Sequence, residues 1–274
     1  MMVAGPRRNQ LRLAFIGWGA IAQRAAELLA QRSPNIVVVG VATRRAPLRD
    51  DDLPAGARWL AAPDDLQHVA PDLVVEAAGR AAVEPWGLAS LRVAPAFVVS
   101  STSAFTDDAV LQRLTSEAER CGSQILIPSG ALAGLDALAA AARLPLDYVT
   151  HRIIKPPGAW RGTPAEDLID LNGLSTAEVF FRGSAREAAH RFPANANVAV
   201  ISALSGIGLD LTRVELIADP NVTKNSHHLT ARGDFGALNV MIENRPFAGN
   251  PKSSELTALS LVRLIEGRVQ PINL

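Results

Sequence analysis

A glycine turn directly after a short apolar segment constrains the fold of this chain more than any other feature of its sequence. Residues Leu11–Ile16 have the pattern of a buried β-strand, and the turn GWGAIA at 17–22 follows at once. A helical pattern runs from about residue 21 to 31, and a second apolar segment, Ile36–Ala42, completes a strand–turn–helix–strand unit. The G-x-G-x-x-A spacing in this context is the fingerprint of a dinucleotide-binding fold.

The small residues of this turn each have a predicted role in binding a pyrophosphate. Gly17 permits the tight turn, Gly19 lets the backbone approach the phosphates, and Ala22 allows close packing of helix on strand. Ala20 and Ile21 begin the helix, whose unpaired N–H groups and positive dipole end favour an anion. The alternative is a glycine-rich turn that only joins a strand to a helix.

Strand and helix patterns go on alternating through the first half of the chain, which predicts a parallel sheet with helices on both faces. We expect strands over Val69–Gly79, Ala96–Ser100 and Gln124–Pro128, and helices over Trp86–Leu91 and Asp107–Arg120. Ligands of such sheets bind at the carboxyl ends of the strands. Gly79, which ends the first of these strands, is therefore a candidate cofactor residue.

The second half of the chain is rich in β-patterns. Strands are expected over Val149–Ile154, Ala177–Phe181, Val214–Ala218, His228–Ala231 and Ala237–Glu243, and helices over Ala131–Arg143, Ala185–Arg191, Val198–Gly206 and Ser253–Glu266. The fold class is therefore α/β, with an N-terminal Rossmann dinucleotide-binding domain over residues 1–130 and an α+β substrate and catalytic domain over residues 131–252. Residues 253–274 are expected to form a helix that packs back on the Rossmann domain, and a cleft between the two domains would hold the small-molecule site.

Composition excludes several classes of protein. Lys plus Arg and Asp plus Glu both number 27 among the 274 residues, and this balance gives no basic surface for nucleic acid. Cys121 is the single cysteine, which excludes an intrachain disulfide and a cysteine-based zinc cluster and fits a reducing cytoplasm. No apolar stretch reaches the roughly 20 residues of a membrane span. We expect no metal, membrane or nucleic-acid partner.

The end of the second predicted strand bears on the choice between NAD and NADP. Folds that select NAD place Asp or Glu there to bind the ribose 2′-hydroxyl, whereas this chain has Thr43, Arg44 and Arg45. Arginine binds a 2′-phosphate through planar, bidentate contacts. The sequence therefore predicts NADP or NAD as cofactor, with Arg44 as a candidate ligand of the 2′-phosphate. The alternative is a pair of solvated loop arginines.

Several clusters of the second half are unlike core filler: SGALAGLD at 129–136, KPPGAW at 155–160, FRGSAREA at 181–188 with FPANANVA at 192–199, DPN at 219–221 with NSHHL at 225–229, and NPKSSELT at 250–257. Together with the opening turn they resemble the L-aspartate dehydrogenase family, over nearly the whole chain. The resemblance implies a homodimeric NAD- or NADP-dependent enzyme that interconverts L-aspartate with oxaloacetate and ammonia through iminoaspartate, by hydride transfer. Some members supply iminoaspartate for pyridine nucleotide biosynthesis.

The resemblance also implies roles for single residues. His227 occupies the position of the catalytic histidine, and Ala131 and Asn197 match the downstream contacts to the cofactor. One position departs from the family pattern, since Ser103 stands where we expect a glycine. A side chain there would crowd the nicotinamide pocket or change the choice of substrate.

Histidine suits the proton transfer of such a reaction because its pKa lies near working pH. His227 and His228 are adjacent, so on a strand they face opposite sides and only one can line the site. His151 lies in the strand that crosses between the domains and is a further candidate. The candidates for holding substrate carboxylates are Lys155, Arg182, Arg186 and Lys252, and Asn225 is a further candidate substrate ligand. Asn195 and Asn197 either bond the carboxamide of nicotinamide or a ribose, or cap the helix that begins near Val198. Trp160 either closes over the substrate or packs in the core.

Two other functions remain open from the sequence. One is an NADP-dependent oxidoreductase that acts on another small amino or oxo acid, since the dihydrodipicolinate reductase and homoserine dehydrogenase groups share the domain plan. The other is a non-catalytic NADPH-binding sensor. Turnover with different acids separates these functions from each other.

Overall fold

The computed structural model describes residues 10–46, 52–247 and 250–273, without the side chains of residues 194, 246, 247 and 250–253. Contacts divide the chain into two compact units. The first contains the residues up to Pro128 together with Ala258–Leu274, and the second contains Ser129–Thr257. No helix in the described part of the chain is long and apolar enough to cross a membrane.

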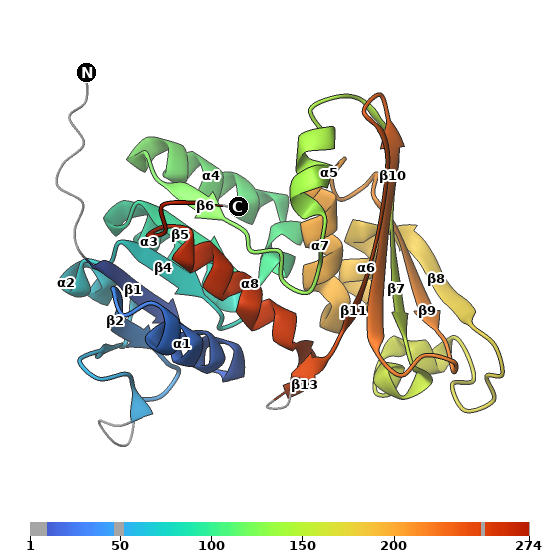
Figure 1. Cartoon of the computed structure of the whole chain (residues 1–274), viewed down its shortest axis with the longest axis horizontal. Helices are drawn as coiled ribbons and strands as arrows, with labels where there is room; N and C mark the ends of the chain where they lie inside the picture. Colours follow the sequence, from blue (N-terminus) through green and yellow to red (C-terminus); the bar gives the residue numbers. More distant parts are fainter. Residues whose placement is uncertain (1–9, 47–51, 248–249, 274) are drawn as a thin grey trace. The chain divides into compact units, whose positions relative to one another are not determined.

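The first unit is built on a six-stranded parallel sheet with the order β3-β2-β1-β4-β5-β6 (Figure 1). This is the strand order of a Rossmann fold, and it confirms the predicted fold class. Strands β4 and β5 are buried on both faces, as parallel strands covered by helices must be. The strands are β1 (Leu11–Ile16), β2 (Ile36–Ala42), β3 (Arg58–Leu60), β4 (Leu73–Glu76), β5 (Ala96–Val99) and β6 (Gln124–Leu126).

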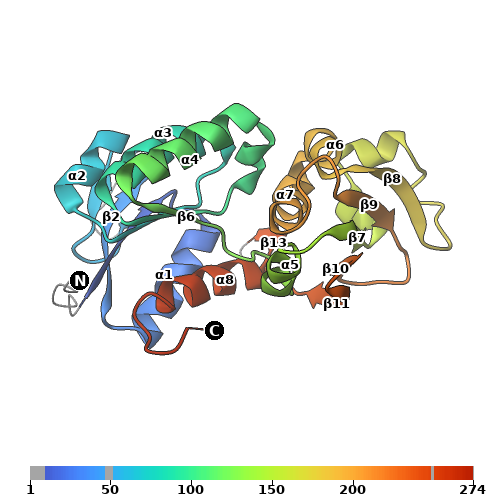
Figure 2. The ribbon, with the colours of Figure 1, turned by 90° about the horizontal axis from the view of Figure 1, so that it is seen from above.

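Helices cover both faces of this sheet (Figure 2). On one face lie α1 (Ala20–Arg32) and α8 (Glu255–Glu266), whose apolar side chains share a core with those of β1, β4 and β5. The buried carboxylate of Glu266 accepts hydrogen bonds from Arg32 Nε at 3.1 Å and Ser33 Oγ at 2.8 Å, which fastens the end of α8 to the end of α1. On the other face lie α3 (Arg80–Val93) and α4 (Asp108–Cys121).

Local signals explain where several of these elements begin and end. Helix α4 begins after Asp107, whose carboxylate accepts from the N–H groups of Ala109 and Val110, and it ends at Gly122 in the left-handed conformation. The predicted strand over Val69–Gly79 is shorter: it begins at Leu73, because residues 66–69 form the short helix α2 (Leu66–Val69), and it ends at Glu76. Helix α3 is longer than the predicted one, since it begins directly after the strand-end loop at Gly79.

The second unit contains a five-stranded sheet with the order β11-β10-β7-β9-β8, in which only β7 and β9 pair in parallel. Helices α5, α6 and α7 lie on one face of it (Figure 1). The predicted helix over Ala131–Arg143 is shorter, because Gly130 and Gly134 both have positive φ and α5 begins only after Gly134. The elements are β7 (Leu146–Lys155), β8 (Glu178–Ser184), β9 (Arg213–Ala218), β10 (Asn225–Gly233), β11 (Gly236–Asn244), α5 (Leu135–Ala141), α6 (Ala185–Arg191) and α7 (Ala196–Ser205), followed by the small pair β12 (Pro246–Phe247) and β13 (Asn250–Ser254).

The two faces of this second sheet differ in character. Toward the helices, Val149, His151 and Ile153 of β7 are all buried. The opposite face is open, with Tyr148 40% and Met241 67% exposed. On that open face Glu215 forms ion pairs with Arg152 at 3.0 Å and Arg182 at 3.2 Å, and His228 Nε2 lies 2.7 Å from Asn239 Oδ1. His151 therefore lies on the buried, helix-covered face of this sheet.

Candidate functional site

The glycine turn of the first unit has the geometry of a phosphate cradle. Gly17 has a φ of +94°, and a Cβ placed on it would lie 2.6 Å from the Cα of Ala78 in the loop after β4. Gly19 is the N-cap of α1 and receives no side-chain capping bond, and a Cβ on it would meet nothing within 4 Å. The first N–H groups of α1, from Ala20 and Ile21 onward, therefore receive no side-chain cap from residue 19. These observations fit the pyrophosphate of a dinucleotide.

The two glycines should respond differently to alanine. Gly17→Ala should lower the free energy of unfolding by roughly 2–4 kcal/mol, because it combines a positive φ with a clash against backbone. Gly19→Ala should leave stability within about 1 kcal/mol but weaken dinucleotide binding by at least about 10-fold, because the methyl group occupies the space of the phosphates. Urea unfolding and fluorescence titration with NADPH measure the two effects. Equal stability losses in both variants would contradict this division of roles.

A buried carboxylate organises the neighbouring strand ends. Glu76 ends β4 and is 0% exposed. Its Oε1 accepts hydrogen bonds from the N–H groups of Ala78 at 2.7 Å and Gly79 at 2.8 Å and from Ser101 Oγ at 2.8 Å, while its Oε2 accepts from Ser101 N–H at 2.9 Å. Glu76 therefore ties the loop after β4 to the end of β5. This role of Glu76 was not predicted from the sequence, although an acidic residue at the end of an apolar strand is a usable signal.

The loop after β2 presents arginines instead of an acidic residue. Thr43 Oγ1 donates to the carbonyl of Arg45 at 2.5 Å and accepts from Trp59 Nε1 at 3.1 Å, which holds this loop against β3. The side chains of Arg44 and Arg45 are exposed. In the described part of this loop, up to residue 46, no carboxylate takes the position that binds a ribose 2′-hydroxyl. The geometry fits a cofactor with or without a 2′-phosphate.

A pair of buried histidines forms the polar centre of the second unit. His227 of β10 is paired across the sheet with Ile153 of β7, so its ring lies on the helix-covered face beside His151. His227 Nδ1 lies 3.1 Å from His151 Nε2, and the ring centroids are 5.3 Å apart. On its other side, His151 Nδ1 lies 3.0 Å from Ser202 Oγ of α7. His228, the neighbour of His227, lies on the opposite, open face, as strand alternation predicts.

Lys155 is a cation at the end of β7, on the same face of the strand as His151. It lies two residues beyond Ile153 on β7, and its Nζ donates to Asn195 Oδ1 at 2.5 Å. The same Nζ lies 4.9 Å from the ring centroid of Trp160. Trp160 is 0% exposed, and its Nε1 donates to the carbonyl of Ile217 at 3.0 Å. The structure supports packing of Trp160 in the core, one of its two predicted roles. Its ring lies beside the ammonium group of Lys155.

Burial sets the protonation of this cluster. Desolvation lowers the pKa of His151 to about 3, and it holds the pKa of His227 well below its usual value, with His151 and Lys155 adding to that shift. Desolvation also lowers the pKa of Lys155 to about 8. Near pH 7 the cluster therefore contains two neutral imidazoles and one ammonium group. A neutral imidazole can accept a proton, and the ammonium can attract a carboxylate.

The structure places the other predicted site residues as follows. Asn225 begins β10 and shares a sheet face with His227, two residues away. The carbonyl of Ala131 accepts a hydrogen bond from Asn244 Nδ2 at 2.9 Å. Asn197 is exposed on α7. Ser103 lies in a 3₁₀ turn over Thr102–Thr106. The backbone of Lys252 is in β13, and its side chain lies outside the described part.

Two predicted carboxylate ligands lie elsewhere. Arg182 is on β8, where it pairs with Glu215 on the open face of the sheet, and Arg186 pairs with Asp210 at 2.7 Å. Neither is brought together with His227 and Lys155 in this unit. Both arginines are held by surface carboxylates, which the sequence pattern alone did not reveal.

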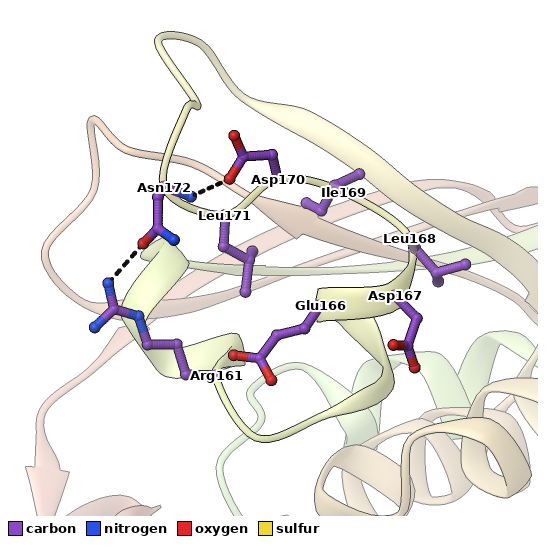
Figure 3. Close-up of a pocket in the computed structure, with 8 residues that line it drawn as sticks. All are labelled: Arg161, Glu166, Asp167, Leu168, Ile169, Asp170, Leu171 and Asn172. Atoms are coloured by element: carbon purple, nitrogen blue, oxygen red, sulfur yellow. Dashed lines mark hydrogen bonds between the residues drawn. The ribbon is translucent and has the colours of Figure 1, made fainter.

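A cavity of about 500 Å³ lies in the loop region that follows β7 (Figure 3). Its lining includes Arg161, Glu166, Asp167 and Asp170, and Arg161 is held by a hydrogen bond to Asn172 at 2.8 Å. None of the residues with predicted chemistry lines it. In the described part of the chain no group of His, Cys, Asp or Glu side chains is arranged to hold a metal ion. The histidine–lysine cluster is therefore the better candidate for a reaction centre.

Comparison with known proteins agrees with this division of the chain. Residues 17–128 match the family model described as homoserine dehydrogenase, NAD binding domain, and residues 136–268 match the model described as aspartate dehydrogenase, C-terminal. An L-aspartate dehydrogenase of Brucella anthropi is 53% identical over 257 residues, which cover 94% of this chain and 96% of that protein. An L-aspartate dehydrogenase of Serratia proteamaculans is 43% identical, over 93% of this chain and 98% of that protein.

Solved structures lead to the same family. The crystal structure of aspartate dehydrogenase from Thermotoga maritima aligns with a TM-score of 0.76 and 28% identity, covering 96% of this chain and 98% of that one. A dihydrodipicolinate reductase from Paenisporosarcina, at 14% identity and a TM-score of 0.52 over 94% of this chain and 92% of that one, shares the fold alone. The resemblance inferred from the motifs is confirmed by these relatives. The chain belongs to the L-aspartate dehydrogenase family.

Proposed function

We propose that this protein is an NAD(P)-dependent L-aspartate dehydrogenase, which interconverts L-aspartate with oxaloacetate and ammonia through iminoaspartate. The observation that carries the proposal is the presence of a buried neutral histidine, His227, and a partly buried ammonium group, Lys155, on one sheet face. This occurs in a chain that is 53% identical to an L-aspartate dehydrogenase. The substrate has two carboxylates and an amine, and the cluster supplies a cation and a proton acceptor.

In this proposal His227 is the catalytic residue that moves protons. It accepts one from the substrate amine, or from the water that attacks the imine carbon, and returns it in the reverse direction. Lys155 holds a substrate carboxylate through a charge-assisted hydrogen bond, and Asn195 orients the ammonium by accepting from it. Asn225 and Lys252 are proposed as further substrate ligands. The nicotinamide, when bound, accepts or donates the hydride at C4.

The proposed cofactor site belongs mostly to the first unit. Gly17, Gly19, Ala20 and Ile21 hold the pyrophosphate, Arg44 contacts the 2′-phosphate of NADP, and Gly79 contacts the cofactor at the end of β4, with Ala131 and Asn197 as contacts from the rest of the chain. Residues 1–130 then act as the dinucleotide-binding domain, residues 131–252 as the substrate and catalytic domain, and residues 253–274 as a helix that completes the first. Ser103 is the position at which a different substrate preference would arise.

Oxidation of NADPH or NADH at 340 nm tests the function directly. We expect a decrease in absorbance that requires both oxaloacetate and ammonium, and formation of NADPH or NADH from L-aspartate in reverse. Activity with a different oxo acid only would replace aspartate by another substrate. Binding of NADPH without turnover of any oxo acid would support the sensor function instead.

Exchange of Arg44 should change the choice of cofactor. Arg44→Asp removes a guanidinium from the 2′-phosphate and offers a carboxylate to the 2′-hydroxyl, so the ratio of kcat/KM for NADP over NAD should fall by about 10–100-fold. Arg143→Asp, an exposed arginine of the second unit, is the matched control and should leave the ratio unchanged. A tenfold preference of the unmodified protein for NAD would already contradict a role of Arg44 in NADP binding.

Assembly and location are also part of the proposal. We expect a homodimer, which is the assembly that the family resemblance favours. The single cysteine, Cys121, fits a cytoplasmic protein. A supply of iminoaspartate for pyridine nucleotide biosynthesis is the pathway that the family resemblance favours. Light scattering of the purified protein tests the dimer.

A further inference from the structure

A chain of hydrogen bonds leads from His227 into the core of the second unit. His227 Nδ1 lies 3.1 Å from His151 Nε2, and His151 Nδ1 lies 3.0 Å from Ser202 Oγ. The hydroxyl of Ser202 donates to the carbonyl of Ala199 at 2.9 Å. This series of hydrogen bonds therefore runs from β10 through β7 to α7 and ends on a backbone carbonyl.

The single proton of the Ser202 hydroxyl decides the direction of every bond in this chain. Because that proton is donated to Ala199, Ser202 Oγ accepts from His151, and the hydrogen of His151 is on Nδ1. A neutral imidazole carries one hydrogen, so His151 Nε2 is an acceptor and receives the Nδ1–H of His227. His227 Nε2 is then left with a free lone pair, which is the state that a general base needs.

We propose that His151 and Ser202 are positioning residues that hold His227 in the tautomer with its hydrogen on Nδ1 and its lone pair on Nε2. This inference rests on the proposed function, in which His227 accepts a proton. His227 is 6% exposed, whereas His151 and Ser202 are 0% exposed, so only His227 can be reached by a ligand. The two inner residues act through it, as the orienting partner does in other histidine-based sites.

The same geometry argues against a proton shuttle. A shuttle needs an acceptor at its far end, and this chain ends on the carbonyl of Ala199, which does not take up a proton. The partner of His227 is His151, which is a neutral ring because burial lowers its pKa to about 3. A carboxylate in that place would carry a negative charge. These hydrogen bonds therefore set the orientation and the tautomer of His227 and place no negative charge beside it.

Kinetics of three variants test the positioning role. Ser202→Ala should lower kcat roughly 10-fold and His151→Ala about 100-fold, with KM for oxaloacetate changed less than about 3-fold, because only the orientation of the base is disturbed. Ser202→Thr, which retains the hydroxyl, should restore most of the loss. Thr212→Val is the matched control: it removes another buried hydroxyl of this unit, one without a hydrogen-bond partner within the described residues, and should leave kcat unchanged.

A spectroscopic measurement tests the tautomer without turnover. In the full-length protein labelled with ¹⁵N-histidine, two-bond ¹H–¹⁵N spectra should show a protonated Nδ1 and an unprotonated Nε2 for His227, assigned by loss of these signals in His227→Ala. In Ser202→Ala the two tautomers should mix. A protonated Nε2 in the unmodified protein would overturn the inference, and so would mixed tautomers in Ser202→Ala with full kcat. Neither result bears on His227 as the base, which the loss of kcat in His227→Ala tests separately.

Discussion

Replacement of His227 by alanine should lower kcat by roughly 10²–10⁴-fold, the usual contribution of a general acid–base group. The affinity for NADPH should stay within a few-fold, because the phosphate cradle around Gly19 belongs to the other unit of the chain. The loss arises because no other neutral imidazole in the cluster can be reached from outside: His151 is fully buried behind His227. Steady-state kinetics with oxaloacetate and ammonium, together with NADPH titration, provide the measurement.

His228→Ala is the matched control for this variant. His228 is adjacent in sequence, but it lies on the open face of the sheet and is bonded to Asn239. It should retain the kcat of the unmodified protein, so a loss in His227→Ala cannot be ascribed to disturbance of β10. An unchanged kcat in His227→Ala would remove this residue from the mechanism, and an equal loss in both variants would indicate damage to the strand.

Replacement of Lys155 by methionine should raise the KM for oxaloacetate by about 10–100-fold, because a charge-assisted hydrogen bond to a carboxylate is lost. Methionine has a similar length and can fill the buried space beside Trp160. Lys224→Met is the matched control, since Lys224 lies in the same unit, half exposed, and pairs with Glu243 at 3.4 Å. It should leave the KM unchanged. A KM that is unaltered in Lys155→Met would exclude Lys155 as the carboxylate ligand.

The pH dependence of KM gives the same residue a second test. Burial lowers the pKa of Lys155 to about 8, so its ammonium group is present below that pH and is lost above it. The KM for oxaloacetate should therefore increase as the pH rises through about 8 in the unmodified protein. In Lys155→Met this increase should disappear, because no titrating group remains at that position. An increase that persists in the variant would assign the titration to another residue.

Prediction from the sequence succeeded where the signal was local. The turn at residues 17–22 predicted a strand, a helix and a dinucleotide-binding domain, because the spacing of its glycines is dictated by backbone sterics within a few residues. Alternating strand and helix patterns predicted the parallel sheet with helices on both faces, although β3 was not among the expected strands. Adjacency predicted that His227 and His228 face opposite sides of a strand, and the family resemblance selected His227. Boundaries were less accurate: α5 begins four residues later than predicted, because the positive φ of Gly134 places it outside the helix.

The arrangement of the candidate site was decided by contacts between distant segments. His227 is 76 residues from His151, and His151 is 51 residues from Ser202, yet they form one chain of hydrogen bonds. No pattern in the sequence reports such pairing, because it depends on the register of β7 against β10 and on the packing of α7 over both. The ion pairs of Arg182 with Glu215 and of Arg186 with Asp210 likewise depend on contacts between segments that are distant in the sequence.

The sequence by itself determined the fold class, the glycine turn and the family, since these depend on residue types at short, regular spacings. Only the tertiary structure decided which histidine supports His227, how Glu76 joins two strand ends, and that Lys155 is desolvated beside Trp160. The physical reason is that protonation and hydrogen-bond direction depend on burial and on partners. Both are properties of the packed chain, whereas strand and helix patterns are properties of neighbouring residues.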